Sequence, residues 1–175
     1  MNLKAAFLPG TPADPDDYWL GLGVIALVDA VRLSVMGPGN SAALWFVVLF
    51  FVAALHMNRL RDAARPRTLA LVVLAAGVIA KGFTAVMAMS IAASFAYLRA
   101  RGIDPSDAEA FQAMAADPGF QADLDRFLRE NAEQLQPLLL EAGAWPSLVA
   151  FWAVIGLLGF WYARMGRGRS ANDRR

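Results

Sequence analysis

Apolar positions fall into four long runs that are separated by polar segments. The runs cover residues 18–36, 41–57, 68–98 and 145–163. A helix that crosses a membrane needs roughly 20 mostly apolar residues, because the hydrocarbon core is about 30 Å thick and a helix rises about 1.5 Å per residue. The pattern therefore predicts an all-α integral membrane protein built as a four-helix bundle.

The polar segments predict how these helices are connected. Gly37-Pro38-Gly39-Asn40 has the composition of a tight turn and makes the first two helices an antiparallel hairpin. Residues 58–67 form an Arg-rich loop before the third helix, which is longer than one crossing requires. Residues 1–17 and 164–175 flank the bundle as an N-terminal segment and a basic tail.

An acidic helical insert, residues 99–144, separates the third and fourth helices. Between residues 102 and 144 the chain has nine Asp and Glu residues and two arginines. Asp104-Pro105 and Asp117-Pro118 each have the composition of a helix start, because aspartate caps exposed N–H groups and proline fits the first helical position. Apolar residues follow at helical spacing and predict two short amphipathic helices: Phe111, Met114, Phe120, Leu124, Phe127 and Leu128.

The distribution of arginine predicts the orientation of the chain. Residues 58–67 contain four arginines and one acid, and residues 164–175 contain five arginines and one acid. Cytoplasmic loops of membrane proteins carry such an excess of positive charge. Both termini and the Arg-rich loop are therefore expected in the cytoplasm, and the insert on the opposite side.

Two stretches near the first two helices resemble a known family. Tyr18-Trp19 opens the first helix, and Asn58-Arg59-Leu60-Arg61-Asp62-Ala63-Ala64-Arg65 follows the second. They resemble the bacterial inner-membrane proteins called domain of unknown function 805, which have an aromatic pair and then an Arg-Leu-His-Asp-x-Gly-Arg-Ser-like motif. Here Arg61 replaces the histidine, Ala64 the glycine and Pro66 the serine. The resemblance covers about residues 1–98 and implies a bacterial inner-membrane architecture, but no reaction, since the family has no established activity.

The arginine motif has two interpretations. In the first, its arginines bind anionic lipid headgroups and anchor the hairpin. In the second, Asp62 organises an arginine fork that docks a partner or a headgroup. The residues concerned are Asn58, Arg59, Arg61, Asp62, Arg65 and Arg67.

Three ionisable residues lie within the predicted spans. Asp29 and Arg32 are three positions apart and share a helix face, and Lys81 lies at a similar depth on the third helix. Charges at such depth are costly and normally have a partner. We expect an Asp29–Lys81 pair with Arg32 sharing the carboxylate, either as a structural clasp or as part of a proton, ion or substrate pathway.

Small residues predict where the helices approach closely. They recur every four positions along the third helix, and such ribbons permit close packing in lipid. We expect this ribbon to pack within the bundle, with Gly156 and Gly159 of the fourth helix as its partners. The ribbon consists of Ala76, Ala80, Thr84, Ala88, Ala92 and Ala96.

The sequence contains little that could support catalysis. Cysteine is absent and histidine occurs once, which excludes thiol chemistry and multi-histidine metal sites. We predict no catalytic residues, metal, cofactor or nucleic-acid partner. The favoured hypothesis is a non-catalytic accessory, assembly or scaffolding subunit in a larger membrane complex. A small homo-oligomeric transporter or channel centred on Asp29 and Lys81 is the alternative, and a membrane enzyme acting on lipid or isoprenoid is a third.

Overall fold

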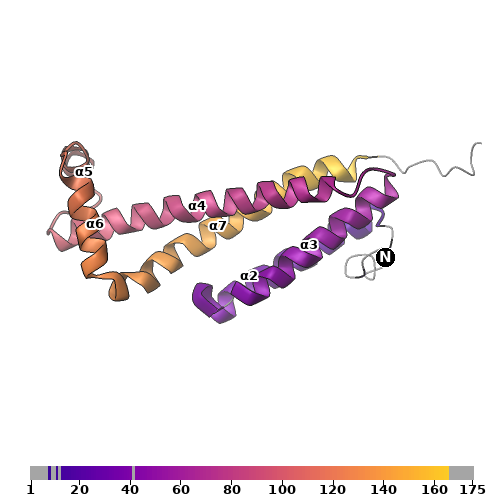
Figure 1. Cartoon of the computed structure of the whole chain (residues 1–175), viewed down its shortest axis with the longest axis horizontal. Helices are drawn as coiled ribbons and strands as arrows, with labels where there is room; N and C mark the ends of the chain where they lie inside the picture. The colour runs from indigo at the N-terminus through magenta and orange to yellow at the C-terminus, as the bar shows by residue number, and fades with distance from the viewer. Residues whose placement is uncertain (1–7, 9–10, 12, 41, 166–175) are drawn as a thin grey trace, which may run out of the picture. The chain divides into compact units, whose positions relative to one another are not determined.

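The computed structural model describes residues 8, 11, 13–40 and 42–165, and this part of the chain is helical with no strand. Figure 1 shows the helices α2 (Pro15–Asn40), α3 (Ala42–Asp62), α4 (Leu69–Ala100), α5 (Ala108–Ala115), α6 (Phe120–Glu130) and α7 (Ala132–Ala163). Four of them are long and apolar enough to cross a membrane: Pro15–Asn40, Ala43–Asp62, Leu69–Ala100 and Ala132–Ala163. The predicted all-α membrane fold is confirmed.

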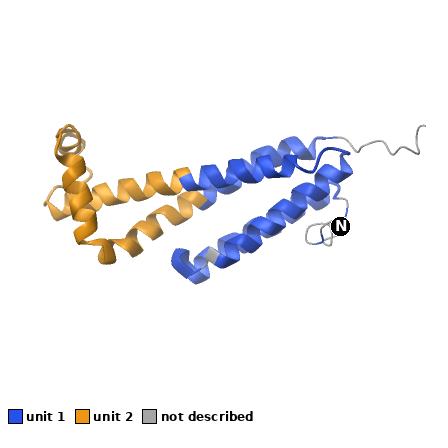
Figure 2. Ribbon diagram, in the orientation of Figure 1, with its two compact units in different colours: residues 1–82, 148–175 blue, residues 83–147 orange. Residues whose placement is uncertain are grey.

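The chain divides into two compact units, which Figure 2 colours separately. Unit 1 comprises residues 1–82 and 148–175, and unit 2 comprises residues 83–147. Unit 1 is a four-helix unit, because α2, α3, the first half of α4 and the second half of α7 all contribute to it. Its buried core includes Tyr18, Leu22, Ile25, Val52, Leu55, Val73, Phe151 and Ile155.

Large apolar side chains cover the outside of these helices. Ile79 of α4 is 70% exposed and Leu157 of α7 is 74% exposed. Water would disfavour such exposure, whereas lipid tails would solvate these side chains. The exposed apolar surface therefore agrees with a membrane location.

The first two helices are joined where the sequence predicts a turn. Gly37 has φ 70° and ψ 171°, a non-helical conformation that interrupts α2 before its last residues. This backbone conformation is accessible to glycine because glycine has no Cβ. Gly37 thus ends the helix proper and begins the hairpin turn.

Helix α3 is longer than predicted and continues through the first half of the expected Arg-rich loop, to Asp62. It ends in a Schellman motif, in which the Arg65 N–H donates to Leu60 O at 2.8 Å and the Ala64 N–H donates to Arg61 O at 3.1 Å. Ala64 occupies the left-handed position of this motif, with φ 52°. Glycine is the usual residue there, and it is also the residue of the motif that this segment resembles.

Helix α4, the next helix in the chain, also ends in a Schellman motif. The Ile103 N–H donates to Leu98 O and the Gly102 N–H donates to Arg99 O, each at 3.0 Å. Gly102 has φ 77° and supplies the left-handed residue without steric cost. The chain therefore contains one Schellman motif with glycine and one with alanine.

Helix α7 begins at Ala132, thirteen residues before the predicted start of the fourth helix at residue 145. The prediction followed the apolar run and missed a helical extension rich in Ala, Leu, Glu and Gln, which are good helix formers. Pro137 and Pro146 both lie inside the helix. Each removes one backbone donor, a loss that one long helix can accommodate.

The predicted pair of short helices in the insert is present as α5 and α6. Their start signals differ from the prediction, however. Asp107 caps α5 by accepting from the N–H groups of Glu109 and Ala110, whereas Asp104 accepts from Ser106 in the preceding turn. These bonds to Ser106 stabilise the carboxylate and lower the pKa of Asp104.

Helix α6 is amphipathic, as predicted. Phe120 and Leu124 are buried against Tyr97 of α4, and Met114, Phe127 and Leu128 pack on this small cluster. The Tyr97 ring meets Phe120 and Phe127 edge-on, with centroids 5.8 and 5.5 Å apart. This aromatic packing ties the insert to the end of α4 and makes unit 2 a compact structure.

Replacing Ala64 by glycine should stabilise the protein by about 0.5–1 kcal/mol, because the left-handed conformation strains any residue with a Cβ. Gly102→Ala at the matching position should destabilise it by a similar amount. Thermal unfolding of both variants in mild detergent measures the two effects. A loss of stability in A64G would contradict the assigned helix end.

Candidate functional site

The first polar site lies in the interior of unit 1 and centres on Asp29. Its side chain is completely buried, and Arg32, one turn later on α2, is 9% exposed. The Asp29 Oδ1 atom accepts from Arg32 Nε at 2.9 Å and lies 2.7 Å from Arg32 Nη2. The other carboxylate oxygen accepts from the indole Nε1 of Trp152 at 2.9 Å. Both oxygens of the buried acid are thus bound, and Trp152 connects α2 to α7.

Lys81 belongs to the same region. Its Nζ lies 5.6 Å from the ring centroid of Trp45, a cation–π contact between α4 and α3. Its charge also interacts with those of Asp29 and Arg32. The predicted grouping of three ionisable residues is therefore present, whereas a direct Asp29–Lys81 salt bridge stays a prediction.

Trp45 and Trp152 are parts of this site that the sequence analysis missed. The ring of Trp45 on α3 lies beside Lys81. Its indole Nε1 is buried without a hydrogen-bond partner among the described residues. Tryptophan within a span that also contains a charge is the signal that could have identified both residues, because a buried indole can donate a hydrogen bond, as Trp152 does, or offer its ring face to a cation, as Trp45 does.

The second polar site surrounds Arg59 at the end of α3. Arg59 is 1% exposed although it belongs to the arginine motif. Its Nε donates to Tyr162 O at 3.2 Å, and its Nη2 donates to Ala163 O at 2.9 Å and also to Met165 O. Its Nη1 donates to Asp62 Oδ2 at 2.6 Å. Arg59 therefore binds the C-terminal end of α7.

Helix chemistry explains this arrangement. The last carbonyl groups of a helix have no partner within it, and they carry the negative end of the helix dipole. A guanidinium group offers five N–H donors in a rigid fork, so one arginine can bind several carbonyls and a carboxylate together. Asp62 balances the buried charge. We call this arrangement the Arg59 clamp, consisting of Arg59, Asp62 and the carbonyls of residues 162, 163 and 165.

His56 and two tyrosines lie next to the clamp. The His56 Nδ1 atom is 2.7 Å from Val52 O, which requires it to donate, and Nε2 is 2.9 Å from the Tyr18 hydroxyl. The Tyr162 hydroxyl donates to Leu69 O at 2.9 Å. These contacts join all four helices of unit 1 at one level. Both ring nitrogens of His56 are hydrogen-bonded, so neither is free to ligate a metal.

The clamp changes the interpretation of the arginine motif. Asp62 does organise Arg59, as the second interpretation requires, but Arg59 binds this chain's own helix and not an external headgroup or partner. Asn58 is also buried and donates from Nδ2 to Leu8 O at 3.0 Å. Only the exposed side chains of the motif are positioned to meet lipid headgroups: Arg61, Arg65 and Arg67. The basic tail from residue 166 lies outside the described residues.

The predicted packing of the small-residue ribbon on Gly156 and Gly159 stays a prediction, and the glycines nearby mark other close approaches. At Gly77, beside the ribbon, a Cβ would lie 2.9 Å from Ile155 and 3.0 Å from Phe151, so α4 packs closely against α7 there. At Gly159 a Cβ would lie 2.9 Å from the Tyr18 hydroxyl, so this glycine accommodates α2 and not the ribbon. Gly156 has no such neighbour within 4 Å. The ribbon itself, Ala76, Ala80, Thr84, Ala88, Ala92 and Ala96, is half-buried.

Replacing Asp29 by asparagine should destabilise the protein by about 3–5 kcal/mol, because Arg32 would remain buried without a counter-charge. Trp152→Phe should cost less, about 1–2 kcal/mol, since it removes one hydrogen bond. Asp29→Asn combined with Arg32→Met should recover much of the loss. Chemical unfolding in detergent measures these differences, and additive effects of D29N and R32M would contradict the pair. Lys81→Met, introduced into the unmodified chain and into the Asp29→Asn variant, tests the predicted direct link to Asp29.

Arg59→Lys should destabilise the protein by about 2–4 kcal/mol, because a single ammonium group cannot reproduce the fork that binds three carbonyls and Asp62. Arg65→Lys is the matched control in an exposed position and should change stability by less than about 0.5 kcal/mol. Equal effects of the two substitutions would show that Arg59 acts only as a surface charge. Thermal unfolding in mild detergent provides the measurement.

Comparison with known proteins adds no further assignment. No family model matches the chain, and no curated protein or solved structure shows significant similarity to it. The resemblance of the arginine motif to the domain of unknown function 805 therefore stays a prediction. Function has to be argued from the two polar sites and from the exposed surfaces of the chain itself.

Proposed function

We propose that this chain is a non-catalytic multi-pass protein of the bacterial inner membrane that serves as an accessory or assembly subunit of a larger membrane complex. The observation that carries the proposal is the engagement of its buried polar groups with one another. Asp29, Arg59 and His56 each bind a side chain or carbonyl of another helix and so hold the helices together. Buried polar groups that bind other helices stabilise the fold, as expected for a scaffold protein.

Exposed charge in unit 2 supports a role in protein contact. This unit has nine acids and four arginines, a net charge of −5. Glu109 of α5 and Asp125 and Glu130 of α6 are exposed. Most charges of the helices thus remain available, although Arg101 and Asp123 approach to 3.3 Å. A dense acidic surface attracts a basic partner surface and repels acidic ones.

The orientation proposed for the chain follows from the arginine distribution. Arg61, Arg65 and Arg67 are exposed at the end of unit 1 that contains the Arg59 clamp. Positive residues in short loops are retained in the cytoplasm. We therefore place the clamp end and both termini in the cytoplasm, and α5 and α6 on the opposite side.

Purification of the tagged chain in mild detergent tests this function. We expect a stoichiometric larger complex, and Asp125→Asn combined with Glu130→Gln should weaken it at physiological salt by removing two exposed charges of α6. Arg126→Gln with Arg129→Gln is the control on the same helix and should not weaken it. Mass spectrometry and size-exclusion chromatography give the composition of the complex.

Two further results check the same proposal. The chain has no cysteine, so Ser106→Cys introduces a single thiol that a membrane-impermeant maleimide should label from outside. A homo-oligomer that produces Asp29-dependent ion flux in liposomes would contradict the accessory role and support transport instead.

A further inference from the structure

Unit 1 contains an apolar groove between α2 and α3, with a volume of about 150 Å³. A dry apolar cavity of about this volume can hold one benzene molecule, so the groove has room for a single side chain. Ile25 and Val48 line it from buried positions, whereas Val28 and Val47 line it from exposed ones. The groove is therefore open to the outside of unit 1, and we call it the α2–α3 groove.

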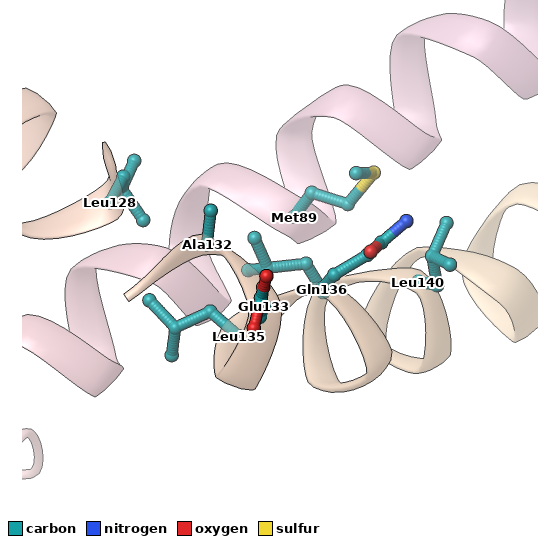
Figure 3. Close-up of a pocket in the computed structure, with 8 residues that line it drawn as sticks. Met89, Leu128, Ala132, Glu133, Leu135, Gln136 and Leu140 are labelled. Carbon is teal, nitrogen blue, oxygen red and sulfur yellow. The ribbon is translucent and has the colours of Figure 1, made fainter. Parts of the chain in front are cut away.

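Arg32 gives this groove a buried charge. Its side chain is among the lining residues and belongs to the part of α2 nearest the hairpin turn. Unit 2 has a larger groove, shown in Figure 3, but its acid Glu133 is exposed. A buried charge discriminates between occupants more strongly than an exposed one, because little water is present to screen it. The charge of Arg32 therefore selects what the α2–α3 groove can accept.

The charges within the four apolar runs do not balance. Their Asp, Glu, Lys and Arg residues are Asp29, Arg32 and Lys81, so the formal charges sum to +1. Both oxygens of Asp29 are already bound, one by Arg32 and the other by Trp152. An excess charge in the hydrocarbon core is costly. A second carboxylate beside Arg32 would remove that cost.

The depth of Arg32 argues against a lipid headgroup as the source of this second anion. Pro15 lies 22 residues before Gly37, about 33 Å along α2, which matches the thickness of the hydrocarbon core. Asp29 lies eight residues before Gly37, about 12 Å from that end. The Arg32 side chain extends toward Asp29, away from the hairpin turn. Lipid phosphates lie in the headgroup layer outside the core. The anion therefore has to come from a side chain within the core.

A second copy of this chain cannot supply that side chain. Asp29 is the only acid of the four apolar runs, and Arg32 and Trp152 already bind both of its oxygens. The second carboxylate therefore belongs to a different protein. Helices associate in lipid through close packing and interhelical polar contacts, and the α2–α3 groove provides for both.

We propose that the α2–α3 groove receives a transmembrane helix of a partner protein, which inserts one Asp or Glu side chain and places its carboxylate at Arg32. The apolar stem of the acid contacts Ile25 and Val48, and the carboxylate neutralises the excess charge. A guanidinium group has five N–H donors, enough for two carboxylates. This inference rests on the proposed role in assembly, because it names the chemistry of the partner.

A synthetic transmembrane helix of leucine and alanine tests the proposal, with one Glu at the depth of Asp29 and a Gln version as its control. Each peptide is added to the full chain in phosphatidylcholine vesicles. The chain has no cysteine, so energy transfer between a dye on the peptide and a dye on Asn40→Cys measures binding. We expect the Glu peptide to bind about tenfold more tightly than the Gln peptide, as close charge pairs across an interface permit.

Substitutions at two adjacent exposed positions of α2 test where the peptide binds. Val28→Trp fills the groove and should weaken binding of the Glu peptide about tenfold. Leu27→Trp is the matched control, because Leu27 does not line the groove, and it should leave binding unchanged. Lys81→Met removes the excess charge and should reduce the preference for Glu over Gln. All three variants retain the Asp29–Arg32 pair.

Equal binding of the two peptides would overturn the proposal, as would equal effects of Val28→Trp and Leu27→Trp. Loss of the Glu preference in vesicles that contain phosphatidylglycerol would show instead that a lipid headgroup reaches Arg32. Self-association of the chain that Val28→Trp abolishes would show that a second copy covers the groove, and either result also overturns the proposal. If the peptides fail but purification yields a stoichiometric complex, only this inference is lost and the proposed function stands.

Discussion

The pairing of buried charges is the constraint on which unit 1 depends. Lipid offers no hydrogen bonds, so a carboxylate or guanidinium within the spans must find its partners in the chain. Asp29 does so through Arg32 and Trp152, and Arg59 does so through Asp62 and the end of α7. Each of these two sets of contacts joins helices that are far apart in the sequence. Polar contacts therefore determine which helices are neighbours, and apolar packing fills the space between them.

The two polar sites link the helices at different levels of unit 1. The Asp29 site lies within the spans and links α2 to α7, while the Lys81–Trp45 contact links α4 to α3. The Arg59 clamp lies at the helix ends and links α3 to α7. His56 and the tyrosines add α2 and α4 at the same level. Polar contacts at two levels fix both the register and the rotation of the helices. Small apolar side chains alone would fix them only loosely.

The elements were largely predictable, and the contacts were not. Apolar runs reveal spans because the length of a membrane helix is fixed by bilayer thickness, and Asp29, Arg32 and Lys81 stand out because charge is rare there. Periodicity carries no information on whether an arginine at a helix end turns outward to lipid or inward to another helix. Arg59 and Arg65 look alike in the sequence, and only the position of α7 distinguishes them. Helix ends were misplaced where good helix formers continue past the apolar run, as before Trp145 and after Met57.

Unequal helix length has a consequence for where the helix ends lie. Helix α3 has 21 residues, whereas α4 and α7 have 32 each, a difference of about 16 Å along the axis. The surplus of α7 precedes its apolar run and contains Glu133, Gln136 and Glu141, so it adds length without adding hydrophobic thickness. The backbone groups at the end of α4 and at the start of α7, which lack partners within their own helices, are therefore displaced beyond the hydrocarbon core. Water can hydrate these groups there, whereas a helix that ended inside the lipid would leave them unpaired.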